Sequence, residues 1–443
     1  MKNWSLGYDL LRYYVRFALW LSHKRIVVTG RKQIPHGKPI IFAANHQNAL
    51  MDSLAIVCTN PSQSVWLARA DIFKSGIARP FLKFMKMTPV YRIRDGKDNL
   101  ANNEQVFASV TMLLENNDTT SLFPEAAHSG RRQMLPHKKA IPRIALEAEN
   151  KNNFQLHLQI VPVGIFYSHY WDFNRTVIVQ YGEPIEIDKY KEDYLSNPQK
   201  TMLILRNEIH DRIAPLTMQI NSVPLYQDYE NMRQLAGKSY SKTRQYSKKP
   251  TLQLFHAEND LIKKLENQEV NQAEAFAKLI DQTRQYFSAL SGKSITDKFI
   301  ISASKSSWPG FLMRLCSIIL TLPIFMAGFL FNALPYFVPR NFLKKKIKDL
   351  AFTATFNFGL GLIINPVVYL IEAGILLALT KSWIIAGSAL ILMPFAGKLA
   401  YKLLEFYTVT LREIRFLVGN KSFRNSIKKL ITQRNELIDS IIQ

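Results

Sequence analysis

The 443-residue sequence contains only two cysteines, Cys58 and Cys316, and the second lies in an apolar run. This scarcity excludes a fold held together by a disulfide framework and fits a reducing compartment. Acidic residues are also few, with 34 Asp and Glu against 57 Lys and Arg, which gives a formal net charge of +23. Such an excess indicates an anionic partner: a nucleic acid, an anionic lipid leaflet or a phosphorylated substrate.

Charged residues are almost missing from three stretches near the C-terminus. Residues 315–338 hold none and 358–380 hold a single one, and a bilayer span needs about 20 apolar residues. The third run, 383–400, reaches a comparable length because Lys398 can snorkel. The sequence therefore predicts an α-helical membrane region over residues 309–400.

The basic residues predict how these runs are oriented. They are concentrated in 340–348 and in the tail 401–443, whereas the turn between the second and third runs carries only Lys381. Because cytoplasmic loops carry an excess of Lys and Arg, both basic segments are expected in the cytoplasm, with 358–400 as a membrane hairpin. The basic N-terminal part is then expected on the cytoplasmic face of an inner or plasma membrane, with the tail as a helix there.

The first apolar run does not fit this orientation as a simple span. To obey the charge rule, residues 315–338 have to enter and leave on the same side of the membrane. Pro323 and Pro335 are expected to interrupt their helix. We therefore interpret this run as a re-entrant or interfacial element, with a simple span as the alternative.

The N-terminus carries one further apolar stretch. Residues 6–21 are apolar almost all round, with Arg12 and Arg16 one turn apart. This pattern is typical of a helix in the membrane interface and equally of an ordinary docking helix, and we assign residues 1–25 to it. The arginines and the missing small-residue cleavage site argue against a signal peptide.

Between residues 26 and 187, β-rich runs alternate with helix-length stretches. The runs are RIVVTG, KPIIFAAN, SVWLARA, TTSLFP, LQIVPVGIFY and TVIVQYGEPIEI. Strands that alternate with helices predict an α/β domain, here 26–218, whose largely buried sheet is flanked by helices. Residues 219–308 are expected to be a polar helical insertion or linker, in which the basic stretch 223–250 is a linker or a loose insertion.

One histidine and one aspartate follow the second β-rich run. In NHQNALMD, His46 comes directly after the strand and Asp52 follows six positions later. The two meet only if His46 lies on the turn and Asp52 on the next helix. The carboxylate would then hold the imidazole in one tautomer and leave the other nitrogen free as a base. Capping or core packing is the structural alternative.

Two later stretches place cations at strand ends. Arg92 and Arg94 alternate along a short predicted strand and so share one face, which suits a phosphate. After the run TTSLFP come Glu125, two alanines and a cluster of cations: His128, Arg131, Arg132, Lys138 and Lys139. Their structural alternatives are a solvated strand edge and a buried turn with a satisfied carboxylate. In the next run, LQIVPVGIFY, Pro162 predicts an edge strand or a bulge.

Taken in order, these blocks resemble the acyltransferase family of phospholipid synthesis, which includes the glycerol 3-phosphate and lysophosphatidic acid acyltransferases. NHQNALMD, VYRIR, FPEAAHS and IVPVGI stand where that family has NHxxxxD, an arginine-ended strand, FPEGTR and a VPV-type strand. The longer His–Asp spacing and FPEAAHSGR resemble the fungal-type branch of glycerol 3-phosphate and dihydroxyacetone phosphate acyltransferases.

The resemblance implies a glycerolipid-acyltransferase-type sheet and a role for each block. His46 would be the general base and Asp52 its orienting partner. Arg94, supported by Glu125, would hold the acceptor phosphate, and the departure from FPEGTR leaves open which downstream cation assists it. The candidate phosphate-binding residues are Arg92, Arg94, Glu125, His128, Arg131, Arg132 and Lys138.

The implied reaction moves a fatty acyl group from acyl coenzyme A or acyl carrier protein to glycerol 3-phosphate or dihydroxyacetone phosphate. Lysophosphatidic acid stays open as the acceptor. No cofactor and no metal are expected, since paired cysteines and HExxH are missing from the sequence. Membrane lipids of an anionic leaflet are the expected partners, and no nucleic acid, because the basic clusters flank apolar runs. A catalytically silent lipid-binding scaffold is the alternative of another class.

Overall fold

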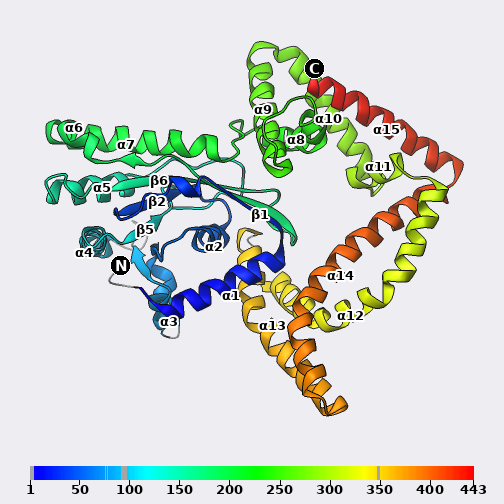
Figure 1. Cartoon of the computed structure of the whole chain (residues 1–443). Coiled ribbons are helices and arrows are strands. Elements are labelled where there is room, and N and C mark those ends of the chain that lie inside the picture. Colours follow the sequence, from blue (N-terminus) through cyan, green and yellow to red (C-terminus); the bar gives the residue numbers. More distant parts are fainter. Residues whose placement is uncertain (1–3, 75, 77, 91–96, 347–349) are drawn as a thin grey trace. The chain divides into compact units, whose positions relative to one another are not determined.

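The computed structural model describes residues 4–74, 76, 78–90, 97–346 and 350–443 (Figure 1). The chain forms two compact units. The first unit consists of Met1–Met218 and Arg340–Leu362, and the second of Gln219–Pro339 and Ile363–Gln443.

The first unit is built on one mixed sheet. Eight strands of the described residues form it, in the order β1-β7-β6-β2-β5-β3-β4, with β8 paired to β6. All neighbouring pairs are parallel except β6 with β7 and β6 with β8. The strands are β1 His23–Thr29, β2 Ile40–Ala44, β3 Val65–Arg69, β4 Met87–Val90, β5 Thr119–Leu122, β6 Gln159–Tyr167, β7 Arg175–Tyr181 and β8 Ile185–Glu186.

Helices cover both faces of this sheet. Side chains along a strand point alternately to the two faces, and each face has its own hydrophobic core. Ile40, Phe42 and Ala44 of β2 belong to one core, and Ile41 and Ala43 to the other. Helices α1 and α2 contribute to the first core and α4, α5 and α7 to the second. Their bounds are α1 Leu6–Ser22, α2 Ala49–Thr59, α4 Lys97–Glu115, α5 Ala140–Lys151 and α7 Pro198–Ile213; α3 Ala78–Phe84 and α6 Lys191–Ser196 are shorter. The predicted α/β sheet flanked by helices is confirmed.

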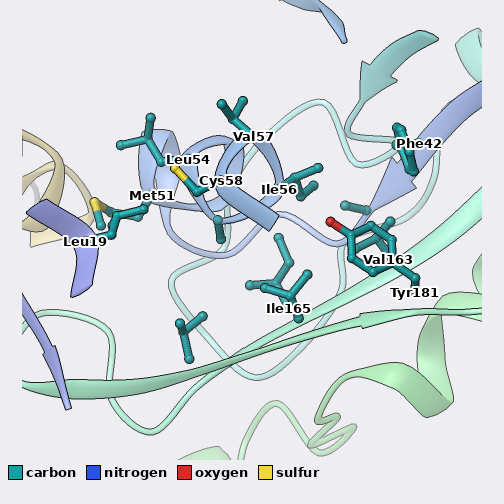
Figure 2. Packing of buried hydrophobic residues seen from close by; sticks show 14 of the residues in the cluster. Leu19, Phe42, Met51, Leu54, Ile56, Val57, Cys58, Val163, Ile165 and Tyr181 are labelled. Atoms are coloured by element: carbon teal, nitrogen blue, oxygen red, sulfur yellow. The ribbon is translucent and has the colours of Figure 1, made fainter. Parts of the chain in front are cut away.

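Figure 2 shows the first core at close range. Met51 of α2 lies beside Leu19 of α1, and Val163 of β6 lies beside Tyr181 of β7; all four belong to this buried cluster. This packing fixes where α2 begins, and α2 is the helix that carries Asp52.

Helix α1 is a docking helix, one of the two interpretations of its sequence. Tyr8, Val15 and Leu19 are buried in the first core, whereas Tyr13 and Trp20 are exposed. The helix therefore docks on the sheet and still presents an apolar face. Its contact with a membrane interface stays a prediction.

Pro162 contradicts the expectation of an edge strand or a bulge. It lies in β6, between β2 and β7, and pairs in register with Ala43. The carbonyl of Pro162 accepts a hydrogen bond from the amide of Gly182 at 2.8 Å, so its backbone groups point away from β2. Gly182 lies between β7 and β8, at the point where β6 changes its pairing partner from one to the other. The ladder is interrupted at this point, so the N–H that Pro162 lacks is not needed.

The second unit contains a helical bundle outside its apolar helices. The bundle consists of α8 Tyr226–Tyr240, α9 Pro250–Asn271, α10 Ala273–Gly292, α11 Asp297–Ser304 and α15 Lys421–Ile442. The prediction of a linker or loose insertion at 223–250 is wrong for α8. Tyr229, Met232, Ala236 and Tyr240 form a buried stripe at helical spacing, and the buried Arg233 pairs with Glu258 at 2.6 Å.

Three helices of the described residues are long and apolar enough to cross a membrane. They are α12 Trp308–Lys346, α13 Leu350–Thr380 and α14 Trp383–Leu417. Helix α12 is continuous through Pro323 and Pro335, so the expected interruption is wrong; an apolar helix tolerates proline where neighbouring groups compensate the lost hydrogen bond. Helix α14 also continues beyond residue 400, where the sequence suggested a boundary.

Candidate active site

The strand register brings two motif loops together. In the parallel pair of β2 and β5, Ala43 is level with Leu122, so the loops after both strands leave the same edge of the sheet. Three hydrogen bonds join these loops. The amide of His46 donates to Glu125 Oε1 at 2.7 Å, and the amides of Ser129 and Gly130 donate to the carbonyls of His46 and Gln47 at 3.3 and 3.1 Å.

His46 and Asp52 meet as their spacing predicted, with the histidine on the turn and the aspartate on α2. Imidazole Nδ1 lies 2.9 Å from Asp52 Oδ2, and the same oxygen accepts the amides of Gln47 and Asn48, each at 2.7 Å. The Asp52 side chain is buried, whereas 15% of the His46 side chain is exposed. The ring of Phe123 stacks on the imidazole with 3.9 Å between the centroids. The two backbone amides fix the Asp52 carboxylate. The carboxylate and the stacked Phe123 ring then fix the imidazole of His46 in one orientation.

This geometry leaves the second imidazole nitrogen for chemistry. With Nδ1–H donating to a carboxylate, the neutral ring carries its lone pair on Nε2. Among the described residues, none hydrogen-bonds to Nε2. An imidazole held in this way can take a proton from a hydroxyl group that docks against it.

Glu125 holds the backbone of both loops. Its Oε1 accepts the amide of His46 and its Oε2 the amide of Leu135, each at 2.7 Å. Burial raises the pKa of Glu125 from its usual 4.5 to about 8, although the two amide hydrogen bonds oppose this shift. The structural alternative from the sequence, a buried turn with a satisfied carboxylate, describes this contact. The support that Glu125 would give to Arg94 stays a prediction.

The predicted phosphate-binding cations lie in different environments. Arg132 is 2% exposed and donates to the carbonyls of Tyr167 and Ser168 at 2.8 and 2.9 Å. Its guanidinium therefore holds the end of β6. Arg131 and Lys138 are exposed on the same loop. The His128 ring lies 5.6 Å from that of His46, edge to face. Two predicted site residues lie outside the described residues: Arg92 and Arg94.

Two positioning residues were missed from the sequence. Asn45 is fully buried; its side chain donates to the carbonyl of Ile165 at 3.0 Å and accepts the amide of Ile165 at 2.7 Å. Tyr170 donates to Gln47 Oε1 at 2.6 Å. The asparagine beside His46 was visible as a polar residue at a strand end, but its partner on β6 is 120 positions away.

Two residues in the loop that follows β5 have a left-handed backbone conformation. Ala126 has φ +58° and Gly130 φ +64°, both in the left-handed region. A Cβ atom on Gly130 would lie 3.1 Å from the Trp171 ring. Such strain is tolerated where the surroundings dictate the conformation, as the hydrogen bonds to His46 and Gln47 do here. Within the described ranges, no group of three or more His, Cys, Asp or Glu residues is placed to hold a metal ion.

Comparisons with known proteins match the part of the chain that contains these loops. Residues 25–166 match the family model described as Acyltransferase. Glycerol-3-phosphate O-acyltransferase 2 of Saccharomyces cerevisiae is 31% identical over 117 residues, which are 26% of this chain and 16% of the yeast protein. The chain thus matches only about a sixth of that relative's length.

Two further matches are named as acyltransferases of 1-acylglycerol phosphates. A 1-acyl-sn-glycerol-3-phosphate acyltransferase of Limnanthes alba is 24% identical over 210 residues, 46% of this chain and 68% of the plant protein. The solved 1-acyl-sn-glycerophosphate acyltransferase of Thermotoga maritima matches with a TM-score of 0.34 and 19% identity, over 46% of this chain and 78% of that one. Residues 25–166 are therefore similar to the acyltransferase family, and the relatives that name a substrate act on glycerol phosphates.

Proposed function

We propose that this protein is a membrane-bound O-acyltransferase that moves a fatty acyl group from an acyl thioester to glycerol 3-phosphate or dihydroxyacetone phosphate. The observation that carries the proposal is the contact between His46 and Asp52, with Nδ1 and Oδ2 2.9 Å apart and the carboxylate fixed by two backbone amides. The similarity to the yeast glycerol-3-phosphate acyltransferase supports this acceptor class.

In the proposed reaction, His46 Nε2 takes the proton of the acceptor hydroxyl while its oxygen attacks the thioester carbonyl. The tetrahedral intermediate then collapses, the C–S bond breaks, and the imidazolium returns the proton to the leaving thiolate. Asp52 stabilises the imidazolium between these steps. The products are an ester and a free thiol, and no acyl-enzyme forms.

The acceptor phosphate requires cations near His46. Arg131 and Lys138 are exposed on the loop that is hydrogen-bonded to the histidine turn, and His128 lies beside the imidazole. Together with Arg92 and Arg94, which the family resemblance assigns, they are the proposed phosphate ligands. The buried Arg132 is better assigned to holding the carbonyl ends of β6.

An assay with a labelled acyl thioester tests the proposal directly. The full-length protein is supplied in turn with glycerol 3-phosphate, dihydroxyacetone phosphate and lysophosphatidic acid. Transfer to one of the first two is expected, and His46→Ala should abolish it. Transfer that survives His46→Ala contradicts the mechanism, and a folded protein that transfers to none of the acceptors points to a lipid-binding scaffold.

A second candidate is a lysophosphatidic acid acyltransferase. The Limnanthes alba relative favours it, because the matched segment covers 68% of that protein. The same assay separates the two candidates, since His46 would act identically and only the preferred acceptor would differ. We propose for either reaction that the enzyme lies on the cytoplasmic face of an inner or plasma membrane, in contact with an anionic leaflet.

A further inference from the structure

The helices before and after the three apolar helices belong to one bundle. Arg434 of α15 pairs with Asp297 of α11 at 2.7 Å, and the rings of Phe299 and Phe423 lie 6.1 Å apart. A bundle held together by ion pairs has to lie on one side of a bilayer, because its charged groups cannot enter hydrocarbon. The chain therefore crosses the membrane an even number of times between α11 and α15, and the three apolar helices cannot all cross.

The start of α13 identifies the helix that does not cross. Ala354 is buried in the core of the first unit, and the hydroxyl of Tyr14 donates to the carbonyl of Leu362 at 2.6 Å. Residues 350–362 thus lie on the same side as the α/β domain. No membrane-spanning helix lies in 219–307, all of which the structure describes, so α11 is on that side too. Both ends of α12 are therefore on one side.

We propose that only α13 and α14 cross the membrane, as a hairpin of residues 363–380 and 383–400. Helix α12 enters and leaves on the side of the α/β domain, as a helix embedded in one leaflet. Each arm of the hairpin is about 27 Å long at 1.5 Å per residue, close to the roughly 30 Å of a hydrocarbon core. This arrangement does not depend on the proposed enzymatic activity.

Contacts between α12 and α14 place one residue of α12 relative to the hairpin. The two helices run antiparallel, since Arg314 pairs with Glu413 and Asn332 donates to the carbonyl of Met393 at 3.1 Å. Met393 lies about 10 Å along α14 from Ala400, where the proposed arm ends, and about 15 Å from Trp383 at the hairpin tip. Asn332 of α12 therefore lies about a third of the way through the hydrocarbon.

The exposed side chains of α12 identify its partner as lipid. Large apolar residues project from it along most of its described length: Leu312, Met313, Leu315, Ile319, Leu320, Leu322, Ile324, Met326, Phe329, Leu330, Leu334, Phe337 and Val338. In the most apolar 18-residue window of Trp308–Val338, only 6% is buried within the protein. Acyl chains of one leaflet suit this surface, because they solvate an apolar helix without requiring a protein partner.

Cysteine labelling in sealed vesicles of known orientation tests the topology. In a Cys316→Ser background, with the buried Cys58 kept, single cysteines replace Lys305 before α12, Lys345 at its end, Lys381 at the hairpin tip and Lys421 after α14. A membrane-impermeant maleimide should label positions 305, 345 and 421 from the same face, and position 381 only from the other. Labelling after detergent is added controls for reactivity, and a melting curve of each variant controls for folding.

Two results would overturn the proposal. Labelling of position 345 from the face opposite to position 305 means that α12 crosses the bilayer. Labelling of position 381 from the same face as the others means that the hairpin does not cross. Acyl transfer is measured separately on the same variants, so a wrong topology and a wrong enzymatic assignment give different results.

Discussion

Asp52→Asn is the most informative change in the proposed site, because it removes one charge and almost no volume. Asp52 Oδ2 accepts His46 Nδ1 at 2.9 Å and the amides of Gln47 and Asn48 at 2.7 Å. An asparagine oxygen in the same place can accept all three hydrogen bonds, so the turn and the tautomer are kept. The variant loses the negative charge opposite the imidazolium that forms during proton transfer.

The size of the effect follows from this distance. Two unit charges about 4 Å apart attract each other by about 4 kcal/mol at an effective dielectric constant of about 20. Because the imidazolium forms only as the acceptor hydroxyl is deprotonated, this energy stabilises the transition state and not the bound substrate. At about 1.4 kcal/mol per factor of ten, kcat should fall about 1,000-fold, whereas KM should change little.

Initial rates with a labelled acyl thioester, at saturating acceptor, measure this loss. The matched control is Glu149→Gln, which also alters a buried carboxylate that accepts two backbone amides, those of Leu156 and Leu158 at 3.2 and 2.5 Å. Both variants should lower the melting temperature, but only Asp52→Asn should lower kcat. A kcat for Asp52→Asn within about tenfold of the parent protein, or an equal loss in Glu149→Gln, would refute the role assigned to Asp52.

Three further predictions concern stability. Gly130→Ala places a side chain at φ +64°, which costs about 1–2 kcal/mol, and should lower the melting temperature; an unchanged value would contradict the strain. The pKa of Glu125 rises from 4.5 to about 8 on folding, so the folded state keeps a proton that the unfolded state loses. The free energy of unfolding should therefore fall as pH rises from 4.5 to 8, and Glu125→Gln should flatten this slope in melting curves; an equal slope in both proteins would contradict it. In detergent, Gly397→Ala should lower the melting temperature because its Cβ would lie 2.3 Å from a side chain of α12, whereas Gly387→Ala, with open space around it, should raise it; equal shifts would contradict the helix contact.

The central part of the site could be predicted because it depends on local chain geometry. A strand, a turn and a helix follow each other within 40–59, and the step from His46 to Asp52 admits one arrangement in which the two side chains meet. The pairing of β2 with β5 was not predicted; it comes from the structure and brings the carboxyl ends of both strands to one edge of the sheet.

Residues whose role depends on distant partners could not be predicted in this way. The side chain of Asn45 is held by Ile165, and that of Arg132 by the carbonyls that end β6. From sequence, Arg132 was one more cation in a basic cluster, and only its burial separates it from Arg131. Pro162 was misread for the same reason, because the gap in the ladder that accommodates it is made by β7 and β8.

The apolar helices show a different limit of the sequence. Hydropathy and length describe what each helix could do alone, and by that measure α12 qualifies as a span as well as α13 and α14 do. The positive-inside rule argues against a span by α12, because the lysines that follow it are expected on the cytoplasmic side. Whether a helix crosses depends on where its two ends are held, which is a property of the folded chain. In the topology that we propose, the ion pair between Asp297 and Arg434 and the burial of Ala354 supply that information, and they favour the arrangement that the lysines predict.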